Sequence, residues 1–232
     1  MTDVGTLDAL VERAGTIVSI CPPDQAAAVA GDVAARGFTG VYVDANAISP
    51  TTARSIGDHF ERFVDGGVVG PPPRAAGTTR LYLSGVDALS VVSRWDGSML
   101  DVRAIGGGPG AASALKMCFA GWTKGSAALL LAVNALATSE GVEAALADEW
   151  AISMPDLAGR SAATAAGTSA KAWRFAGEME EIAATYAAAG LPDGYHLAAA
   201  ETFRRLAGFK DEPADLAATI DALLAGGAGE QH

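Results

Sequence analysis

Short apolar runs alternate with helical segments over the first half of the chain, and this alternation constrains the fold more than any other feature of the sequence. Strands are predicted at residues 16–21, 40–44, 63–65, 80–84 and 101–105. Helices are predicted at residues 7–14, 24–36, 50–60 and 86–94. Strands and helices that alternate at this spacing form βαβ units with a mostly parallel sheet, and near-continuous apolar strands are typical of a sheet that is covered on both faces.

The pattern changes after Gly110, and no further strand is predicted. Ala-rich helical stretches follow instead, at residues 111–136, 141–151, 170–189, 194–207 and 214–224. The sequence therefore predicts an α/β domain over residues 1–110 and an all-α domain over residues 111–232.

Composition excludes several classes of protein. The formal net charge of −11 predicts a surface that repels phosphate backbones, so nucleic acid is not an expected partner. An anionic substrate would need a local cluster of Lys and Arg. The longest uncharged stretch, residues 125–139, is shorter than the ~20 residues of a membrane helix. Because the N-terminus also lacks the pattern of a signal peptide, we expect a soluble, cytoplasmic protein with no membrane partner.

The two cysteines, Cys21 and Cys118, are far apart and do not have CxxC spacing. Neither a zinc site nor a disulfide framework is therefore expected. Both cysteines lie in apolar runs, which predicts buried free thiols in a reducing compartment. No metal site is predicted, since His59 and His196 also lack partners at metal-binding spacing.

One segment, Gly108-Pro-Gly110-Ala-Ala-Ser113, has the spacing of a dinucleotide-binding loop and lies between a predicted strand and a helix. However, no Asp or Glu occurs from residue 106 to residue 139, so the acidic residue that binds ribose ~20 residues later is missing. Pro109 also removes one backbone donor. The favoured interpretation is a tight turn between the two domains.

Lys116 is the first charged residue of the long helix that follows this turn, and its neighbours are apolar on every side. A helix with this pattern is usually buried, and burial lowers the pKa of a lysine toward the range that is useful for proton transfer. Alternatively, the Lys116 ammonium reaches solvent along its aliphatic stem. The residues alone leave both interpretations open.

Four segments, in order along the chain, resemble segments of the β-hydroxyacid dehydrogenases. Ile20-Cys-Pro-Pro23 and Val43-Asp-Ala-Asn-Ala-Ile-Ser-Pro50 resemble the strand-end loops beside the cofactor. Val64-Asp-Gly-Gly-Val-Val-Gly70 resembles the substrate-binding segment, and Gly110-Ala-Ala-Ser-Ala-Leu-Lys116 resembles the segment that carries the catalytic lysine. Ala114-Leu-Lys-Met-Cys-Phe-Ala120 is similar to a stretch of the 6-phosphogluconate dehydrogenase-like oxidoreductases, whose C-terminal domain is all-helical.

The resemblance implies an incomplete Rossmann-type parallel sheet followed by a helical C-terminal domain. Residues 1–110 would be a partial dinucleotide-binding domain, and residues 111–232 a 6-phosphogluconate dehydrogenase-like helical domain. The implied activity is hydride transfer between NADP or NAD and a small hydroxy or oxo substrate, with Lys116 as the general acid and base. A homodimer through the helical domain is also expected, because the long apolar helix suits an intertwined dimer.

The resemblance also assigns binding residues. The cofactor would be bound by Cys21, Pro22, Pro23 and Asn46. The substrate would be bound by Gly67, Val68, Val69 and Gly70. Lys171, Trp173 and Arg174 are candidates for the distal end of the substrate, although a solvated helix face with one buried aromatic explains them equally well.

The sequence departs from the family at three places. Ala120 stands where an Asn usually follows the lysine, and Val69 stands where the substrate segment usually has a Ser. Glu180-Glu181 replaces a Lys-Asp pair in a late helix. Because a polar clamp has been replaced by apolar or acidic groups, a bulkier or less acidic substrate is expected.

The first βαβ unit of the family, which carries its glycine-rich loop, is missing from the sequence, a difference of roughly 50–60 residues. Two explanations compete. Either Met1 is not the natural start, or the chain is a shortened, non-catalytic paralogue that acts as a helical dimerisation or binding module. The residues before Gly5 provide no new helix cap, which favours the first explanation. Dehydrogenase activity is therefore expected if the glycine-loop unit is supplied.

Overall fold

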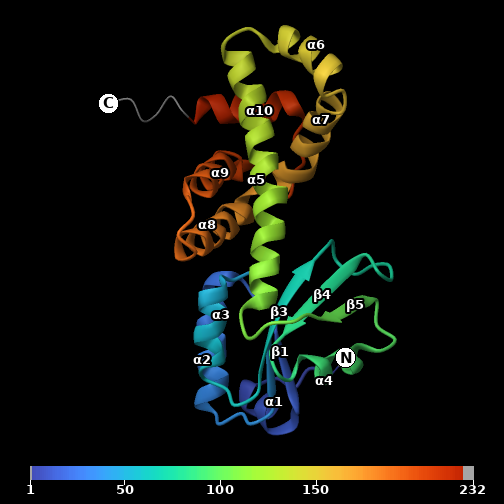
Figure 1. Ribbon diagram of the computed structural model, residues 1–232, viewed down its shortest axis with the longest axis vertical. Helices are drawn as coiled ribbons and strands as arrows, with labels where there is room; N and C mark the ends of the chain where they lie inside the picture. The colour runs from blue at the N-terminus through green and yellow to red at the C-terminus, as the bar shows by residue number, and fades with distance from the viewer. Residues whose placement is uncertain (1, 227–232) are drawn as a thin grey trace. The chain divides into compact units, whose positions relative to one another are not determined.

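The computed structural model describes residues 2–226. The chain forms two compact units that are divided between Phe119 and Ala120, and each is described by itself (Figure 1). The first unit contains a mixed α/β structure and the second is helical. The predicted fold class, a mostly parallel sheet followed by a helical region, is confirmed.

The first unit is built on a five-stranded sheet with the order β1-β2-β3-β4-β5. Its strands are β1 (Thr16–Ser19), β2 (Val41–Asp44), β3 (Phe63–Val69), β4 (Thr79–Ser84) and β5 (Leu100–Ala104). Three neighbouring pairs are parallel, and β3 pairs with β4 in the antiparallel sense. The carboxyl ends of the parallel strands β1, β2 and β3 therefore lie at one edge of the sheet, where α/β folds bind ligands.

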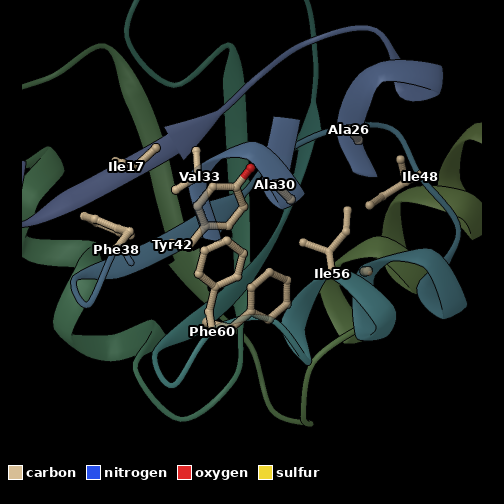
Figure 2. Packing of buried hydrophobic residues seen from close by; sticks show 11 residues of the cluster. Ile17, Ala26, Ala30, Val33, Phe38, Tyr42, Ile48, Ile56 and Phe60 are labelled. Atoms are coloured by element: carbon tan, nitrogen blue, oxygen red, sulfur yellow. The ribbon is translucent and has the colours of Figure 1, made fainter. Parts of the chain in front are cut away.

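Three helices, α1 (Leu7–Arg13), α2 (Ala26–Ala35) and α3 (Pro50–Gly57), pack on one face of this sheet. Pro50 opens α3, and the hydroxyl of Ser49 accepts a hydrogen bond from the backbone N–H of Thr52, which caps the first turn. Figure 2 shows the apolar cluster between helices and sheet, in which the ring of Tyr42 stacks on Phe60 at a centroid distance of 4.2 Å. Burial raises the pKa of the Tyr42 phenol to about 12.

The opposite face of the sheet is covered by the short helix α4 (Ala88–Val92) and the 3-10 turn η2 (Ser93–Trp95). The strand residues on this face alternate with those on the first, as the two-residue period of a strand requires. Val41, Val43, Val64, Leu81 and Leu83 form its buried layer. The alternate residues of each strand, including Asp44 and Asp65, therefore lie on the first face.

The second unit consists of helices. The long helix α5 (Ala111–Ser139) begins in the first unit and continues into the second. The other helices and 3-10 turns are α6 (Glu143–Ser153), α7 (Leu157–Thr168), η3 (Ser169–Lys171), α8 (Ala172–Ala188), α9 (Gly194–Arg205), η4 (Ala207–Phe209) and α10 (Leu216–Ala225). Helices α8 and α9 share a core in which Phe175 meets Phe203 edge to face, with a centroid distance of 5.4 Å.

Several local predictions were wrong. The strand predicted at residues 63–65 extends to Val69, because its glycine-containing end pairs with β4. Helix α7 was not predicted, since its Ala, Gly and Thr residues give no clear apolar period. Cys118 is exposed and Cys21 is partly buried, so neither is the buried thiol expected. No helix in residues 2–226 is both long and apolar enough to span a membrane.

Candidate functional site

The strand ends of β1 and β2 are joined by the side chain of Asn46, which is 3 % exposed. Its Oδ1 accepts a hydrogen bond from the backbone N–H of Cys21 at 2.6 Å. Its Nδ2 donates to Ser19 Oγ and to Asp44 Oδ2, both at 3.0 Å. Because the donors and the acceptor of its amide are used within the protein, Asn46 fixes the loop at Cys21 relative to β2.

Asp44 is buried at the end of β2 and faces Asp65 on the neighbouring strand. Its carboxylate accepts hydrogen bonds from the backbone N–H and the side-chain amide of Asn46. Burial nevertheless raises the pKa of Asp44 to about 6, with a smaller raising contribution from the charge of Asp65. A carboxyl group in the C-terminal region of the sheet therefore titrates close to neutral pH.

Asp65 lies fully buried on β3 and holds the beginning of α5. Its Oδ1 accepts a hydrogen bond from Ser113 Oγ at 2.5 Å, and its Oδ2 accepts from the backbone N–H of Ser113 at 2.9 Å. Ser84 on β4 donates to Asp65 Oδ2 at 3.0 Å and accepts from the backbone N–H of Ala112 at 3.0 Å. A carboxylate at the start of a helix is also favoured by the helix dipole.

These contacts decide what the glycine-rich segment at residues 108–113 can do. The first-turn N–H groups of Ala112 and Ser113 donate to Ser84 and Asp65. The N–H of Ala111 donates to the carbonyl of Gly108. A dinucleotide loop needs such groups free to bind phosphate, so this segment is a turn into α5 and not a phosphate cradle.

Lys116 lies one turn into α5, against the glycine of β3 that faces it. A Cβ atom on Gly67 would lie 2.6 Å from the carbonyl oxygen of Ala112 and 3.2 Å from Cβ of Lys116. Only a glycine permits this approach of the two backbones. Lys116 is partly buried, and the sides of α5 around it differ, since Met117 is buried whereas Cys118 is exposed. The prediction that this helix is buried on every side around Lys116 is therefore wrong.

The remaining predicted site residues of the first unit lie at two places. Cys21, Pro22 and Pro23 follow β1, and Pro23 opens a 3-10 turn. Gly67, Val68 and Val69 are strand residues and not a loop, while Gly70 follows with a left-handed φ of 121°. The structure thus brings Lys116 together with Gly67, and Cys21 together with Asn46.

The predicted residues of the second unit lie around the beginning of α8. Lys171 ends the turn η3 and is exposed, and Arg174 is exposed on α8. Trp173 is 46 % exposed and lies under Nζ of Lys210, which is 4.5 Å from the ring centroid. Trp173 is therefore not the buried aromatic of the alternative interpretation.

Sequence reasoning missed two groups of polar residues. Ser84, Ser113 and Asp65 are far apart in sequence and gave no motif. In the second unit, Lys124 forms an ion pair with Glu178, whose side chains are only 14 % and 16 % exposed. Nζ of Lys124 also lies 4.8 Å from the ring centroid of Phe175. No cluster of His, Cys, Asp and Glu in the described part of the chain could hold a metal ion.

Comparison with known sequences gives two matches. The family model of a domain of unknown function, DUF1932, matches residues 137–206. An uncharacterized 28.5 kDa protein of Methanothermus fervidus is 31 % identical over 137 residues, which cover 57 % of this chain and 52 % of that protein. The match thus spans about half the length of this curated relative.

Solved structures share the fold over most of the chain. A conserved hypothetical protein from Sinorhizobium meliloti has a TM-score of 0.74 at 24 % identity, covering 94 % of this chain and 77 % of its own. A conserved protein of unknown function, described as structurally similar to 3-hydroxyacid dehydrogenases, has a TM-score of 0.66 at 25 % identity, covering 86 % and 78 %. Mycobacterium tuberculosis 3-hydroxyisobutyrate dehydrogenase has a TM-score of 0.62 at 18 % identity, covering 94 % and 81 %. The chain therefore shares the fold of the 3-hydroxyacid dehydrogenases.

Proposed function

We propose that this protein is an NAD(P)-dependent oxidoreductase that interconverts a small hydroxy and oxo compound. The observation that carries the proposal is the position of Lys116, on the first turns of α5 and in contact with Gly67. The fold that the chain shares with 3-hydroxyisobutyrate dehydrogenase supports it. Reductive aminase structures of Aspergillus terreus with NADPH, with a TM-score of 0.50, share the fold as well.

The proposed role of Lys116 is to exchange a proton with the oxygen of the substrate. A nicotinamide supplies or accepts the hydride when it is bound. Lys116 is partly buried and is carried by a helix whose start is fixed by Asp65 and Ser84. A proton donor held in this way is oriented before the substrate arrives, which is how a positioned general acid accelerates a reaction.

The strand-end loops fit the nicotinamide end of such a cofactor. Cys21, Pro22 and Pro23 follow β1, and Asn46 follows β2, at the edge where α/β sheets bind dinucleotides. Because the amide of Asn46 is already bonded to Cys21, Ser19 and Asp44, its proposed role is to shape the loop rather than to donate to the ligand. The described residues do not offer a glycine-rich phosphate cradle, so the pyrophosphate site is not assigned to them.

The proposed substrate site lies along β3. Gly67 allows β3 to pack closely against α5 at Lys116, and Val68, Val69 and Gly70 continue the strand and its turn. Lys171, Trp173 and Arg174 remain candidates for the distal end of the substrate. Their exposure makes them accessible, but Trp173 already contacts Lys210.

A second candidate function is a non-catalytic helical module that forms a homodimer. One observation favours it: Trp122, Leu129 and Leu136, at seven-residue spacing on α5, are 74 %, 66 % and 62 % exposed. Residues seven apart share a face of a helix, so these side chains form an apolar stripe of the kind that pairs with another helix. The two candidates are compatible, because a dimer can also be an enzyme.

The test is a fluorescence titration with NADPH and NADH, followed by assays with 3-hydroxy acids and oxo acids. We expect Lys116→Ala to bind cofactor normally and to lower kcat by roughly 10²- to 10⁴-fold, the usual contribution of a general acid or base. Lys116→Arg is the matched control for charge, because its guanidinium stays protonated and cannot exchange the proton. Full turnover by both variants would falsify the role of Lys116.

If the chain alone binds neither cofactor, the titration is repeated with a strand–glycine loop–helix segment joined before β1. The dimer is tested by sedimentation of wild type and Trp122→Glu. If the protein is a dimer and binds no cofactor either with or without the added segment, the result supports the helical module instead.

A further inference from the structure

The side chains of β4 that alternate with its buried residues lie on the face of the sheet that carries Asp65 and Gly67. In the antiparallel register, Ser84 is opposite Asp65, Tyr82 is opposite Gly67 and Arg80 is opposite Val69. Residues directly opposite one another in an antiparallel pair project from the same face. The hydrogen bond from Ser84 to Asp65 agrees with this assignment.

Lys116 packs against the same face of the sheet, at Gly67. The Cβ position of Gly67 lies 3.2 Å from Cβ of Lys116, and Tyr82 is the cross-strand neighbour of that glycine. Arg80 is two residues further along β4, which corresponds to about 7 Å along a strand. A small substrate beside Lys116 can therefore extend along the strand toward Arg80.

The charged side chains on this face of β4 and β5 differ in whether they form an ion pair. Arg103 on β5 donates to both carboxylate oxygens of Asp101, at distances between 2.5 and 3.1 Å, and Tyr82 is its neighbour in the register of β4 and β5. Arg80 is partly buried and, within residues 2–226, has no carboxylate within ion-pair distance. Asp101 lies beside Arg80 in the register of β4 and β5, but its carboxylate is bonded to Arg103, so Arg80 is the cation of this face that makes no ion pair in the described part of the chain.

The positive charge of Arg80 contrasts with the net charge of −11 on the whole chain. An acidic protein repels an anionic substrate over most of its surface, and local cations beside the reacting group overcome this repulsion. The guanidinium of arginine binds a carboxylate through two parallel hydrogen bonds, which also orients the ligand.

We propose that Arg80 is a substrate-specificity residue that binds the carboxylate of an oxo or hydroxy acid, while Lys116 exchanges a proton at its reacting oxygen. Tyr82 is the next residue of β4 on this face, opposite Gly67, and Asp101 keeps Arg103 occupied. This proposal rests on the oxidoreductase function proposed above. It places the acidic end of the substrate along β4, rather than at the late helix that carries Lys171 and Arg174.

The test compares levulinate, an oxo acid, with its uncharged ethyl ester as substrates in the presence of NADPH. In wild type we expect kcat/KM to favour the acid. In Arg80→Gln we expect KM for the acid to rise by roughly 10- to 100-fold, the range of a lost charge-assisted hydrogen bond, while KM for the ester and kcat for both change little. Arg80→Lys should recover part of the loss. Equal effects on acid and ester would overturn the proposal.

Arg94→Gln is the matched control. It removes the same charge from the first unit, but Arg94 is exposed on η2, which packs with α4 on the opposite face of the sheet. We expect this variant to behave as wild type in both assays. A loss of acid preference in Arg94→Gln as large as in Arg80→Gln would show a general effect of net charge and overturn the proposal.

Direct binding separates a failure of this proposal from a failure of the oxidoreductase function. If wild type turns over neither compound, levulinate binding is measured by NMR titration of the chain without cofactor. Binding that is weakened in Arg80→Gln but not in Arg94→Gln supports the carboxylate site even though the proposed reaction is absent. Absent binding, or binding that is unchanged in Arg80→Gln, overturns the site.

Discussion

The two units bury polar groups in different ways. In the first unit, Asp65 is buried against donors supplied by a neighbouring strand and by the beginning of α5. In the second unit, Lys124 and Glu178 pair with each other between helices, and Nδ1 of the buried His196 has no hydrogen-bond partner within residues 2–226. The short side chains of Asp65, Ser84 and Ser113 and one backbone N–H leave little freedom to reorient, whereas the two long side chains of the ion pair can. The comparison explains why a precisely placed lysine is expected in the first unit.

The largest effect is expected from Asp65→Ala. The substitution leaves Ser84 Oγ and both donors of Ser113 without an acceptor in a buried place. Each buried donor left unpaired costs about 1–3 kcal/mol, and some can find other partners, so the free energy of unfolding should fall by about 3–5 kcal/mol. Urea denaturation measures it, with Asp58→Ala as the exposed control. A loss below 1 kcal/mol would mean that the start of α5 is held by other contacts.

A second effect of about 3 kcal/mol should appear as a pH dependence. Because the pKa of Asp44 is raised from 3.8 to about 6, its protonated form is favoured in the folded state. Its contribution to stability is present below pH 3.8 and is lost as the pH rises through 6, by about 1.4 kcal/mol for each pH unit between the two values.

Asp44→Asn removes this titration. The free energy of unfolding of wild type relative to Asp44→Asn should therefore fall between pH 4 and pH 7, as measured by urea denaturation at each pH. A difference between the two proteins that does not change with pH contradicts the raised pKa.

In the second unit, removal of one partner of the Lys124–Glu178 pair should cost about 2 kcal/mol, since it leaves a partly buried charge unpaired. Lys124→Met and Glu178→Met each test this by thermal denaturation. The double variant should recover most of the loss, because two apolar side chains of similar volume often replace an ion pair without a net cost. Additive losses in the double variant would show that the pair matters through its packing with Phe175 and not through its charges.

The smallest effect is expected at His196. Burial lowers the pKa of this histidine, and its ring meets Tyr186 edge to face at a centroid distance of 4.2 Å. The unfolded chain therefore binds a proton more readily, so stability should fall as the pH drops below 6.5. His196→Phe keeps the ring and should remove this acid sensitivity in thermal denaturation between pH 5 and pH 8. An unchanged slope would assign the acid sensitivity to other groups.

The sequence predicted the elements better than it predicted the contacts. Alternating apolar runs located every strand, because burial on both faces leaves a direct signal in the residues. The extension of β3 over Gly66–Val69 was missed, because glycines indicate a turn unless a partner strand is known. The bond between Asp65 and Ser113 joins residues 48 apart, and nothing local distinguishes them. The exposure of Cys118 also depends on which side of α5 is covered.

The missing side chain at Gly67 has a consequence for how this site can change. Two backbones meet there without any side chain between them, so the spacing between β3 and α5 does not depend on which residues surround it. Substitutions at the neighbouring strand positions can therefore change the surface beside Lys116 while Lys116 keeps its place. The same feature makes Gly67 itself intolerant: even an alanine would meet the carbonyl oxygen of Ala112 at 2.6 Å and displace the helix that carries the lysine.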